Sequence, residues 1–94
     1  MDNEAVLFLD VRNADELPKI TFKNSIQIPL MNLENEIEKL DSKQTIYVFC
    51  QSGIRSKMAV ELLQKKEFKD VKSVVGGALE MRKLLKEDKI LITD

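Results

Sequence analysis

The sequence contains no histidine and a single cysteine, Cys50. A structural zinc site takes four cysteine or histidine ligands, so this chain cannot build one. Cys-His and Ser-His catalysis is excluded as well, because both need an imidazole base. One cysteine cannot form an internal disulfide, which suits a reducing compartment, and we expect a cytoplasmic protein.

The sequence also lacks long apolar runs. No stretch approaches the ~20 apolar residues that a membrane-spanning helix needs. The first residues are acidic, whereas a secretion signal would be basic and then apolar, so we expect no contact with a membrane. The length of 94 residues, with 44% hydrophobic and 33% charged side chains, is typical of one globular domain, 1–94.

Charge is nearly balanced overall, at a net -1, but its distribution is uneven. Residues 1–41 carry 9 acidic and 4 basic side chains, whereas residues 42–94 carry 7 acidic and 11 basic ones. A solvated surface is the simpler interpretation, and the alternative is a basic rim that meets an anion or an acidic partner. No basic patch is rich in aromatic side chains, so we expect no binding of nucleic acid.

Short apolar runs alternate with segments of helical periodicity along the chain. The runs predict buried strands, and their alternation with helices predicts an α/β fold, a parallel sheet with helices on both faces. We expect strands at 6–9, 26–28, 45–49 and 71–75, with 90–92 as a final strand or a packed tail. We expect helices at 30–40, 56–66 and 78–87, and one helical turn at 13–17.

Two of these predicted helices have a clear inward face, because their apolar side chains recur every three or four residues. The helix at 30–40 would bury Leu30, Leu33, Ile37 and Leu40 and expose Glu34, Glu36 and Glu38. The helix at 56–66 would bury Met58, Ala59, Leu62 and Leu63.

The segment that can carry chemistry follows the strand at 45–49. Cys50 ends the strand, Arg55 comes five positions later, and Gly53 lies between them. Glycine accepts the positive φ of a tight loop, so backbone N–H groups can converge on an anion at the positive end of the following helix. A cysteine there should have a lowered pKa and be largely thiolate. Arg55 would supply a planar, permanently charged donor for an anionic substrate.

Each of these residues also has a simpler interpretation. A lone cysteine after a strand is usually a small buried apolar residue. Arg55 by itself would be a surface or ion-pairing residue, and Gly53 only a turn. Ser56 can be the N-cap of the helix. The combination of these residues at a strand-to-helix turn favours a functional loop.

Four motifs, taken in order, resemble those of a rhodanese homology domain. They are Leu-Asp-Val-Arg at 9–12 with Glu16 after it, Ile-Pro-Leu at 28–30, Cys-Gln-Ser-Gly-Ile-Arg-Ser at 50–56, and Val-Gly-Gly at 75–77. The resemblance extends over nearly the whole chain. It implies a mostly parallel central sheet of about five short strands, flanked by helices on both faces. It implies no metal and no organic cofactor.

By the same resemblance Cys50 is the catalytic residue. It would accept a sulfane sulfur as a covalent persulfide and pass it on, so the protein would be a sulfurtransferase. Substrate binding would fall to the loop residues Gln51, Ser52, Gly53, Ile54 and Arg55. Structural support would come from Asp10, Arg12, Glu16 and Ser56, with Asp10 tying strand ends to loops and Arg12 pairing with Glu16.

The implied partners are a sulfane-sulfur donor, either thiosulfate or the persulfide of a cysteine desulfurase, and a thiophilic acceptor. The strings at 28–30, 50–56 and 60–63 further resemble the carboxyl-terminal rhodanese domain of adenylyltransferases that serve molybdopterin and thiamine synthesis. In those proteins the acceptor is a ubiquitin-like sulfur carrier. Rhodanese domains commonly begin with a strand and a short helix that residues 1–5 cannot supply, so we expect a minimal domain or a fragment of a longer chain.

Two other functions stay open. Rhodanese-like dual-specificity phosphatases place five residues between the cysteine and the arginine, which suits a tetrahedral phosphate, whereas this chain has four. A Cys-based phosphatase or arsenate reductase is therefore the weaker alternative. The other is a non-catalytic rhodanese-like module that binds protein, and the presence of Cys50, Gly53 and Arg55 together argues against it.

Overall fold

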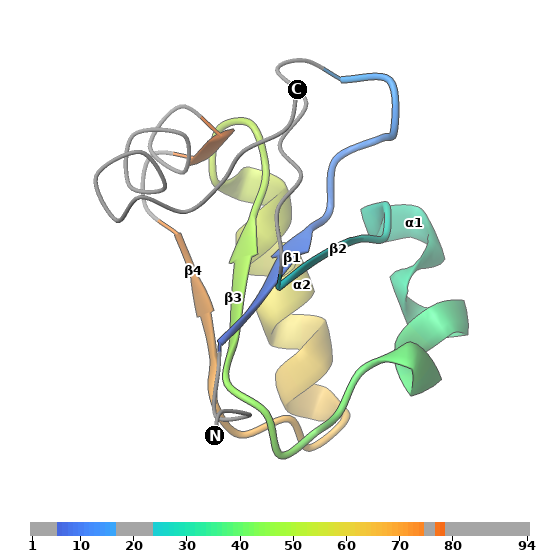
Figure 1. Ribbon diagram of the computed structural model, residues 1–94, viewed down its shortest axis with the longest axis vertical. Coiled ribbons are helices and arrows are strands. Elements are labelled where there is room, and N and C mark those ends of the chain that lie inside the picture. The colour runs from blue at the N-terminus through green and yellow to red at the C-terminus, as the bar shows by residue number, and fades with distance from the viewer. Residues whose placement is uncertain (1–5, 17–23, 75–76, 79–94) are drawn as a thin grey trace.

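The computed structural model describes residues 6–16, 24–74 and 77–78. Within them four strands form one parallel sheet in the order β2-β1-β3-β4 (Figure 1). The strands are β1 (Leu7–Asp10), β2 (Ser25–Gln27), β3 (Ile46–Phe49) and β4 (Val71–Ser73). The helical segments are α1 (Leu30–Leu33), the 3-10 helix η1 (Glu34–Lys39) and α2 (Ile54–Lys65). The predicted parallel α/β architecture is confirmed, and the expected segment at 90–92 lies outside the described residues.

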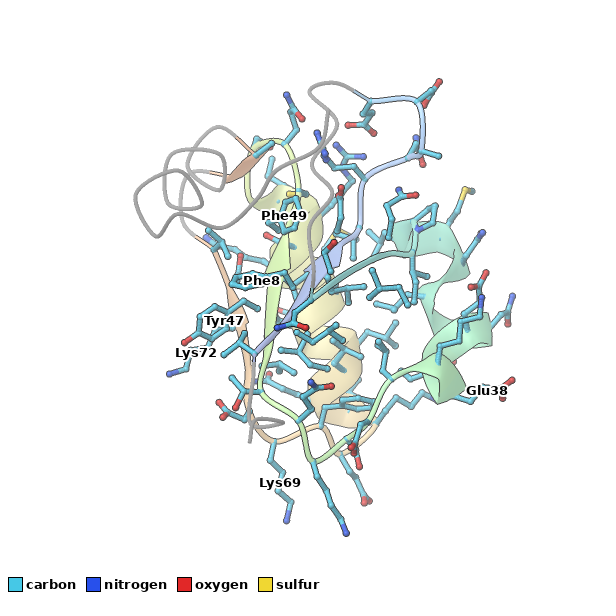
Figure 2. The ribbon with its side chains drawn as sticks, viewed as in Figure 1. Phe8, Glu38, Tyr47, Phe49, Lys69 and Lys72 are labelled. Carbon is cyan, nitrogen blue, oxygen red and sulfur yellow. The ribbon has the colours of Figure 1, made fainter. Side chains whose placement is uncertain are left out.

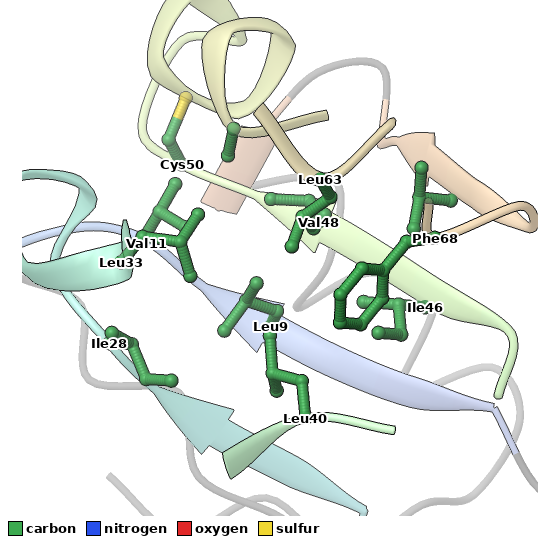
Figure 3. Close-up of a cluster of buried hydrophobic side chains, with 12 residues drawn as sticks. Leu9, Val11, Ile28, Leu33, Leu40, Ile46, Val48, Cys50, Leu63 and Phe68 are labelled. Atoms are coloured by element: carbon green, nitrogen blue, oxygen red, sulfur yellow. The ribbon is translucent and has the colours of Figure 1, made fainter. Parts of the chain in front are cut away.

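The apolar core lies between the sheet and the helices. Leu9 of β1 and Val48 of β3 project to this side, where Leu33 of α1 and Leu63 of α2 meet them (Figure 3). These four side chains have no exposed surface, and burying each one stabilises the fold by about 1.5–3 kcal/mol. Because α1, η1 and α2 all contribute to this one cluster, they cover the same face of the sheet.

The other face of the central strands is apolar as well. Phe8 and Tyr47 are neighbours there, with their ring centroids 5.7 Å apart in an edge-to-face arrangement (Figure 2). Phe49 is fully buried farther along β3. Of the helix predicted at 78–87 only Ala78, a buried residue, is described. Two apolar faces agree with the uninterrupted apolar sequences of β1 and β3.

The helix predicted at 30–40 is instead divided into α1 and η1, with Glu36 outside helical geometry at φ -115° and ψ 19°. Glu34 and Glu38 are one α-helical turn apart, and like charges at that spacing oppose a regular helix. The inward face is nevertheless the predicted one: Leu33 and Leu40 are buried, whereas Glu34 and Glu38 are exposed.

Helix α2 starts two residues earlier than predicted, because Gly53 serves as its N-cap with a φ of 102°. Ala59 and Leu63 are buried as expected, but Met58 is 53% exposed, so its predicted burial is wrong. Met58 lies one helical turn after Ile54, which is also exposed, and both are on the side of α2 away from the core. No helix within the described ranges is long and apolar enough to cross a membrane.

The strand ends place the functional segments together. Asp10 of β1 pairs with Phe49 of β3 in the parallel ladder, so both strands end at one edge of the sheet. Ligands of open parallel sheets bind at this edge. The segment after β1 forms a turn closed by the bond from the Glu16 N–H to the Asn13 carbonyl at 3.1 Å, where one helical turn was predicted at 13–17.

Candidate functional site

Cys50 follows β3 directly and is fully buried, with its sulfur toward the loop and the first turn of α2 (Figure 3). Its Sγ accepts the backbone N–H of Gly53 at 3.0 Å and that of Ser56 at 3.3 Å. The positive φ of Gly53 turns the loop back over the sulfur so that these donors converge on it. The predicted nest of N–H groups is therefore formed around the thiol itself.

The pKa of Cys50 reflects two opposing effects. Burial of the thiol raises its pKa, whereas hydrogen bonds from Ser56, Gly53 and Ser52 lower it, and together they outweigh the burial, so the pKa lies below its ordinary value. The thiolate is the nucleophilic form of cysteine. The predicted lowering of the pKa thus has a specific cause in the backbone of the loop.

Gly77 packs against the backbone of this loop. It has a φ of 68°, and a Cβ atom there would lie 2.2 Å from the Gln51 carbonyl oxygen and 2.7 Å from that of Cys50. A side chain at this position would therefore displace the loop. Gly53 differs, because a Cβ there would meet no atom within 4 Å, and its positive φ alone requires glycine.

The simpler interpretation of Ser56 as the N-cap of α2 does not hold, because Gly53 occupies the N-cap position. Ser56 is instead buried inside the first turn, where its hydroxyl donates to the Gly53 carbonyl at 3.1 Å. Its Oγ also lies 2.6 Å from the Oγ of Ser73, the last residue of β4. Sequence reasoning missed Ser73. Its one signal was a hydroxyl at the end of an apolar strand that neighbours β3.

Asp10 and Arg12 form a buried ion pair beneath the loop. Arg12 donates through Nε and Nη2 to the two carboxylate oxygens of Asp10, at 3.0 and 2.9 Å. Its Nη1 donates to Oε1 of Gln51 at 3.1 Å. Asp10 therefore ties the end of β1 to the loop after β3, as expected, but it does so through Arg12. The predicted pairing of Arg12 with Glu16 is wrong.

Glu16 pairs with Arg55 instead. Nη1 of Arg55 donates to Oε2 of Glu16 at 2.6 Å and Nη2 donates to Oε1 at 2.8 Å. The side chains are 26% and 33% exposed, respectively. The hydrogen bond from Arg55 lowers the pKa of Glu16 to about 2, and the same bond raises the pKa of Arg55. The residue predicted to bind an anionic substrate thus has a carboxylate partner within the protein.

The structure brings the predicted site residues to the edge of the sheet where β1 and β3 end. The backbone of Ser52, Gly53 and Ser56 contacts the Cys50 sulfur, whereas the Gln51 and Arg55 side chains are held by residues of the segment after β1. Ile54 is 69% exposed and lies at the rim. No cluster of three acidic, cysteine or histidine side chains that could hold a metal is present among the described residues.

A basic hollow lies at the opposite end of the sheet. It is lined by Ser42, Lys43, Lys66, Glu67, Lys69 and Asp70. Lys69 precedes β4, so the hollow is at the amino ends of the strands, and Figure 2 shows this side chain projecting away from the molecule. The positive charge of the second half of the chain is thus found in part far from Cys50.

Comparison with known proteins gives the family. The profile of the rhodanese-like domain matches residues 1–91. YrkF of Bacillus subtilis, which is named as a candidate sulfur carrier protein, is 37% identical over 75 residues, covering 80% of this chain and 40% of YrkF. The thiosulfate sulfurtransferase GlpE of Coxiella burnetii is 29% identical over 72 residues, covering 77% of this chain and 67% of GlpE.

A solved structure extends the likeness to the fold. The reduced form of Bacillus anthracis CoADR-RHD is 34% identical to this chain and superposes with a TM-score of 0.76. The match covers 95% of this chain but 16% of that protein. The chain is therefore similar to one domain of that larger protein, and it spans less than half the length of YrkF.

Proposed function

The chain belongs to the rhodanese-like domain family, and from this premise we propose that it is a sulfurtransferase in which Cys50 carries the sulfur. Cys50 accepts a sulfane sulfur as a persulfide and passes it to a thiophilic acceptor. The observation that carries the proposal is the pair of N–H bonds from Gly53 and Ser56 to the Cys50 sulfur. These bonds stabilise the Cys50 thiolate that attacks the donor and the same thiolate when the acceptor regenerates it.

The first half-reaction is a displacement at sulfur. With thiosulfate, the Cys50 thiolate attacks the outer sulfur, a new S–S bond forms, and the S–S bond of thiosulfate breaks. Its electron pair leaves with sulfite, and Cys50 is left as a persulfide anion. We infer that the terminal sulfur is then held by the remaining N–H groups of residues 51–55.

The second half-reaction restores the thiolate. An acceptor such as cyanide attacks the terminal sulfur, the S–S bond to Cys50 breaks, and its electron pair returns to Cys50 while thiocyanate departs. Because the donor's remainder leaves before the acceptor reacts, the kinetics should be ping-pong. The buried pair of Asp10 and Arg12, with its bond to Gln51, holds the loop in one shape through both steps.

The physiological partners follow from the same chemistry. We propose thiosulfate or the persulfide of a cysteine desulfurase as donor, and a sulfur carrier protein, such as the ubiquitin-like carriers of molybdopterin and thiamine synthesis, as acceptor. The names of the two curated relatives, a sulfur carrier and a sulfurtransferase, support a role in sulfur relay. A genomic reading frame that continues upstream into an adenylyltransferase would identify the carrier as the acceptor.

The geometry and the chemistry of the loop favour sulfur transfer over the two alternative functions. A phosphatase or arsenate reductase needs room for a tetrahedral oxyanion, and here the N–H groups of Gly53 and Ser56 already approach the sulfur. A purely protein-binding module has no need for a thiol whose pKa is lowered.

Intact mass spectrometry tests the proposal directly. The protein is incubated with thiosulfate, with and without a reductant, beside Cys50→Ala. We expect a gain of one sulfur atom that the reductant reverses and that Cys50→Ala lacks. Cys50→Ala is a matched control, because it removes the sulfur of a buried side chain and leaves the charged pairs intact.

Two results would contradict the proposal. One is a mass gain that survives in Cys50→Ala. The other is no gain from thiosulfate and none from a cysteine desulfurase with cysteine, which would favour the protein-binding module.

A further inference from the structure

Glu16 engages both terminal nitrogens of Arg55. The two bonds, at 2.6 and 2.8 Å, have the parallel geometry in which a carboxylate and a guanidinium bind most strongly. They connect the segment after β1 to the first turn of α2, 39 positions apart in the sequence. An oxyanion bound at Arg55 would use the same nitrogens. Glu16 and an anionic donor therefore compete for one cation.

Arg12, the other arginine that contacts the loop, also has its charge balanced by a carboxylate. Arg12 contacts Gln51 and is paired with the carboxylate of Asp10. The two ion pairs that support the loop thus have no net charge, and the Cys50 thiolate adds one negative charge beside them. Among the described groups that contact the sulfur or hold Gln51 and Arg55, a donor therefore meets N–H dipoles and a negative sulfur but no cation without a carboxylate partner. Each negative charge on the donor then adds repulsion.

We propose that Glu16 is a positioning residue that sets donor preference. By holding Arg55 it disfavours dianionic donors such as thiosulfate relative to donors of lower charge, namely persulfides and thiosulfonates in which an organic group carries the sulfane sulfur. This inference rests on the proposed sulfur transfer and adds to it the class of donor.

The charge balance of the two reactions shows why the donor class matters. With thiosulfate, the thiolate and the dianion bring three negative charges together, and persulfide anion and sulfite leave with the same three. With a protonated organic persulfide, the thiolate attacks the terminal sulfur, the S–S bond of the donor breaks, and its electron pair leaves as an organic thiolate. The proton stays on the transferred sulfur, so one negative charge is present throughout.

The opposite role for Glu16 predicts the opposite result. If Glu16 served to orient Arg55 toward a bound anion, removing the carboxylate would weaken the use of thiosulfate. The contacts favour competition between Glu16 and the anionic donor. The Glu16 carboxylate accepts from both Nη1 and Nη2 of Arg55, the two nitrogens that would otherwise bind the anion.

The experiment compares two donors of similar size that differ by one charge, thiosulfate and methanethiosulfonate. Each transfers its outer sulfur, leaving sulfite and methanesulfinate respectively, and kcat/KM is measured for both with cyanide as acceptor. We expect Glu16→Gln to raise the ratio of kcat/KM for thiosulfate to that for methanethiosulfonate about 1.4- to fivefold, the range for one partly exposed ion pair. An unchanged or lower ratio would overturn the inference. A general change in thiolate reactivity or folding cancels in the ratio.

Two further variants make the comparison specific. Glu16→Gln with Arg55→Gln should return the ratio to that of the wild type, because the released cation is then missing. Glu36→Gln removes one carboxylate from the pair with Lys39 on η1, away from the loop (Figure 1), and should leave the ratio unchanged. A rise in either variant equal to that of Glu16→Gln would show that net charge alone sets the ratio, and would overturn the inference.

A binding measurement separates this inference from the proposed function. If neither donor transfers sulfur to the wild type or to Glu16→Gln, the proposed sulfur transfer is wrong. The effect of Glu16 on anion binding is then measured with two unreactive anions that differ by one charge, sulfate and methanesulfonate. Titration followed by NMR should show that Glu16→Gln binds sulfate more tightly than the wild type does, with a smaller gain for methanesulfonate. No gain for sulfate would overturn the inference.

Discussion

Asp10→Asn tests how much the buried ion pair contributes to the fold. The side chains of Asp10 and Arg12 are 7% and 2% exposed, respectively, and the carboxylate accepts bonds from Nε, Nη2 and the backbone N–H of Arg12. Asparagine keeps the volume and one acceptor oxygen but leaves the Arg12 charge buried without a counter-ion. Breaking such a pair costs about 3–5 kcal/mol, and we expect about 3 kcal/mol because one oxygen still accepts.

The assay is urea unfolding at pH 7, followed by circular dichroism. Glu16→Gln is the matched control, because it removes the same kind of bidentate pair at side chains that are 26% and 33% exposed, and it should cost less than about 1 kcal/mol. In thermal unfolding, a loss of about 3 kcal/mol corresponds to a Tm lower by roughly 12–24 °C for a domain of this size. Equal losses for the two variants would refute the reasoning from burial.

Three further predictions concern the loop. Gly77→Ala should lower the free energy of unfolding by about 2 kcal/mol or more in the same assay, since its Cβ would lie 2.2 Å from the Gln51 carbonyl oxygen; an unchanged stability would contradict this close approach. Alkylation of Cys50 by iodoacetamide should reach half its maximal rate at a lower pH in the folded protein than in urea, because the folded pKa is lowered; equal midpoints would contradict it. Arg55 lowers the pKa of Glu16 from about 4.3 when unfolded to about 2 when folded, and solvent screening of this partly exposed pair keeps the resulting stability below about 1 kcal/mol; that stability is complete above about pH 5 and is lost as pH falls toward 2. Stability-pH curves of the wild type and Glu16→Gln should therefore diverge above pH 2 and run parallel above pH 5, and parallel curves throughout would count against the ion pair.

The segment around Cys50 was predictable because its determinants are close in sequence. An apolar strand, a glycine and a helix within a few residues require a tight turn, and backbone N–H groups in such a turn converge whichever side chains are present. The N–H bonds of Gly53 and Ser56 to the sulfur follow from this local geometry. The start of α2 was misplaced by two residues because glycine at the N-cap carries no side-chain signal.

Helix 30–40 and Met58 show where periodicity is insufficient. Apolar spacing predicted which side of α1 and η1 is buried but not the 3-10 conformation; like charges at i and i+4 weaken a regular helix, and that effect leaves no mark on the apolar pattern. In α2 the apolar residues extend beyond the face that packs on the sheet, because Ile54 and Met58 are exposed. Ala59 and Leu63 are buried and Met58 is not, because the position of β3 and β4 decides which side of α2 is covered.

The sequence by itself determined the parallel α/β fold, the place of Cys50 at the end of a central strand, and the loop that lowers its pKa. Only the tertiary structure decided how the charged side chains pair. Arg12 and Arg55 each have two carboxylates of the same chemistry to choose from, Asp10 and Glu16, and residue type cannot distinguish between these partners. The pairing of Arg55 with Glu16 depends on the sheet, because β1 and β3 end at the same edge. This arrangement places Arg55 2.6 Å from a carboxylate 39 positions earlier in the chain.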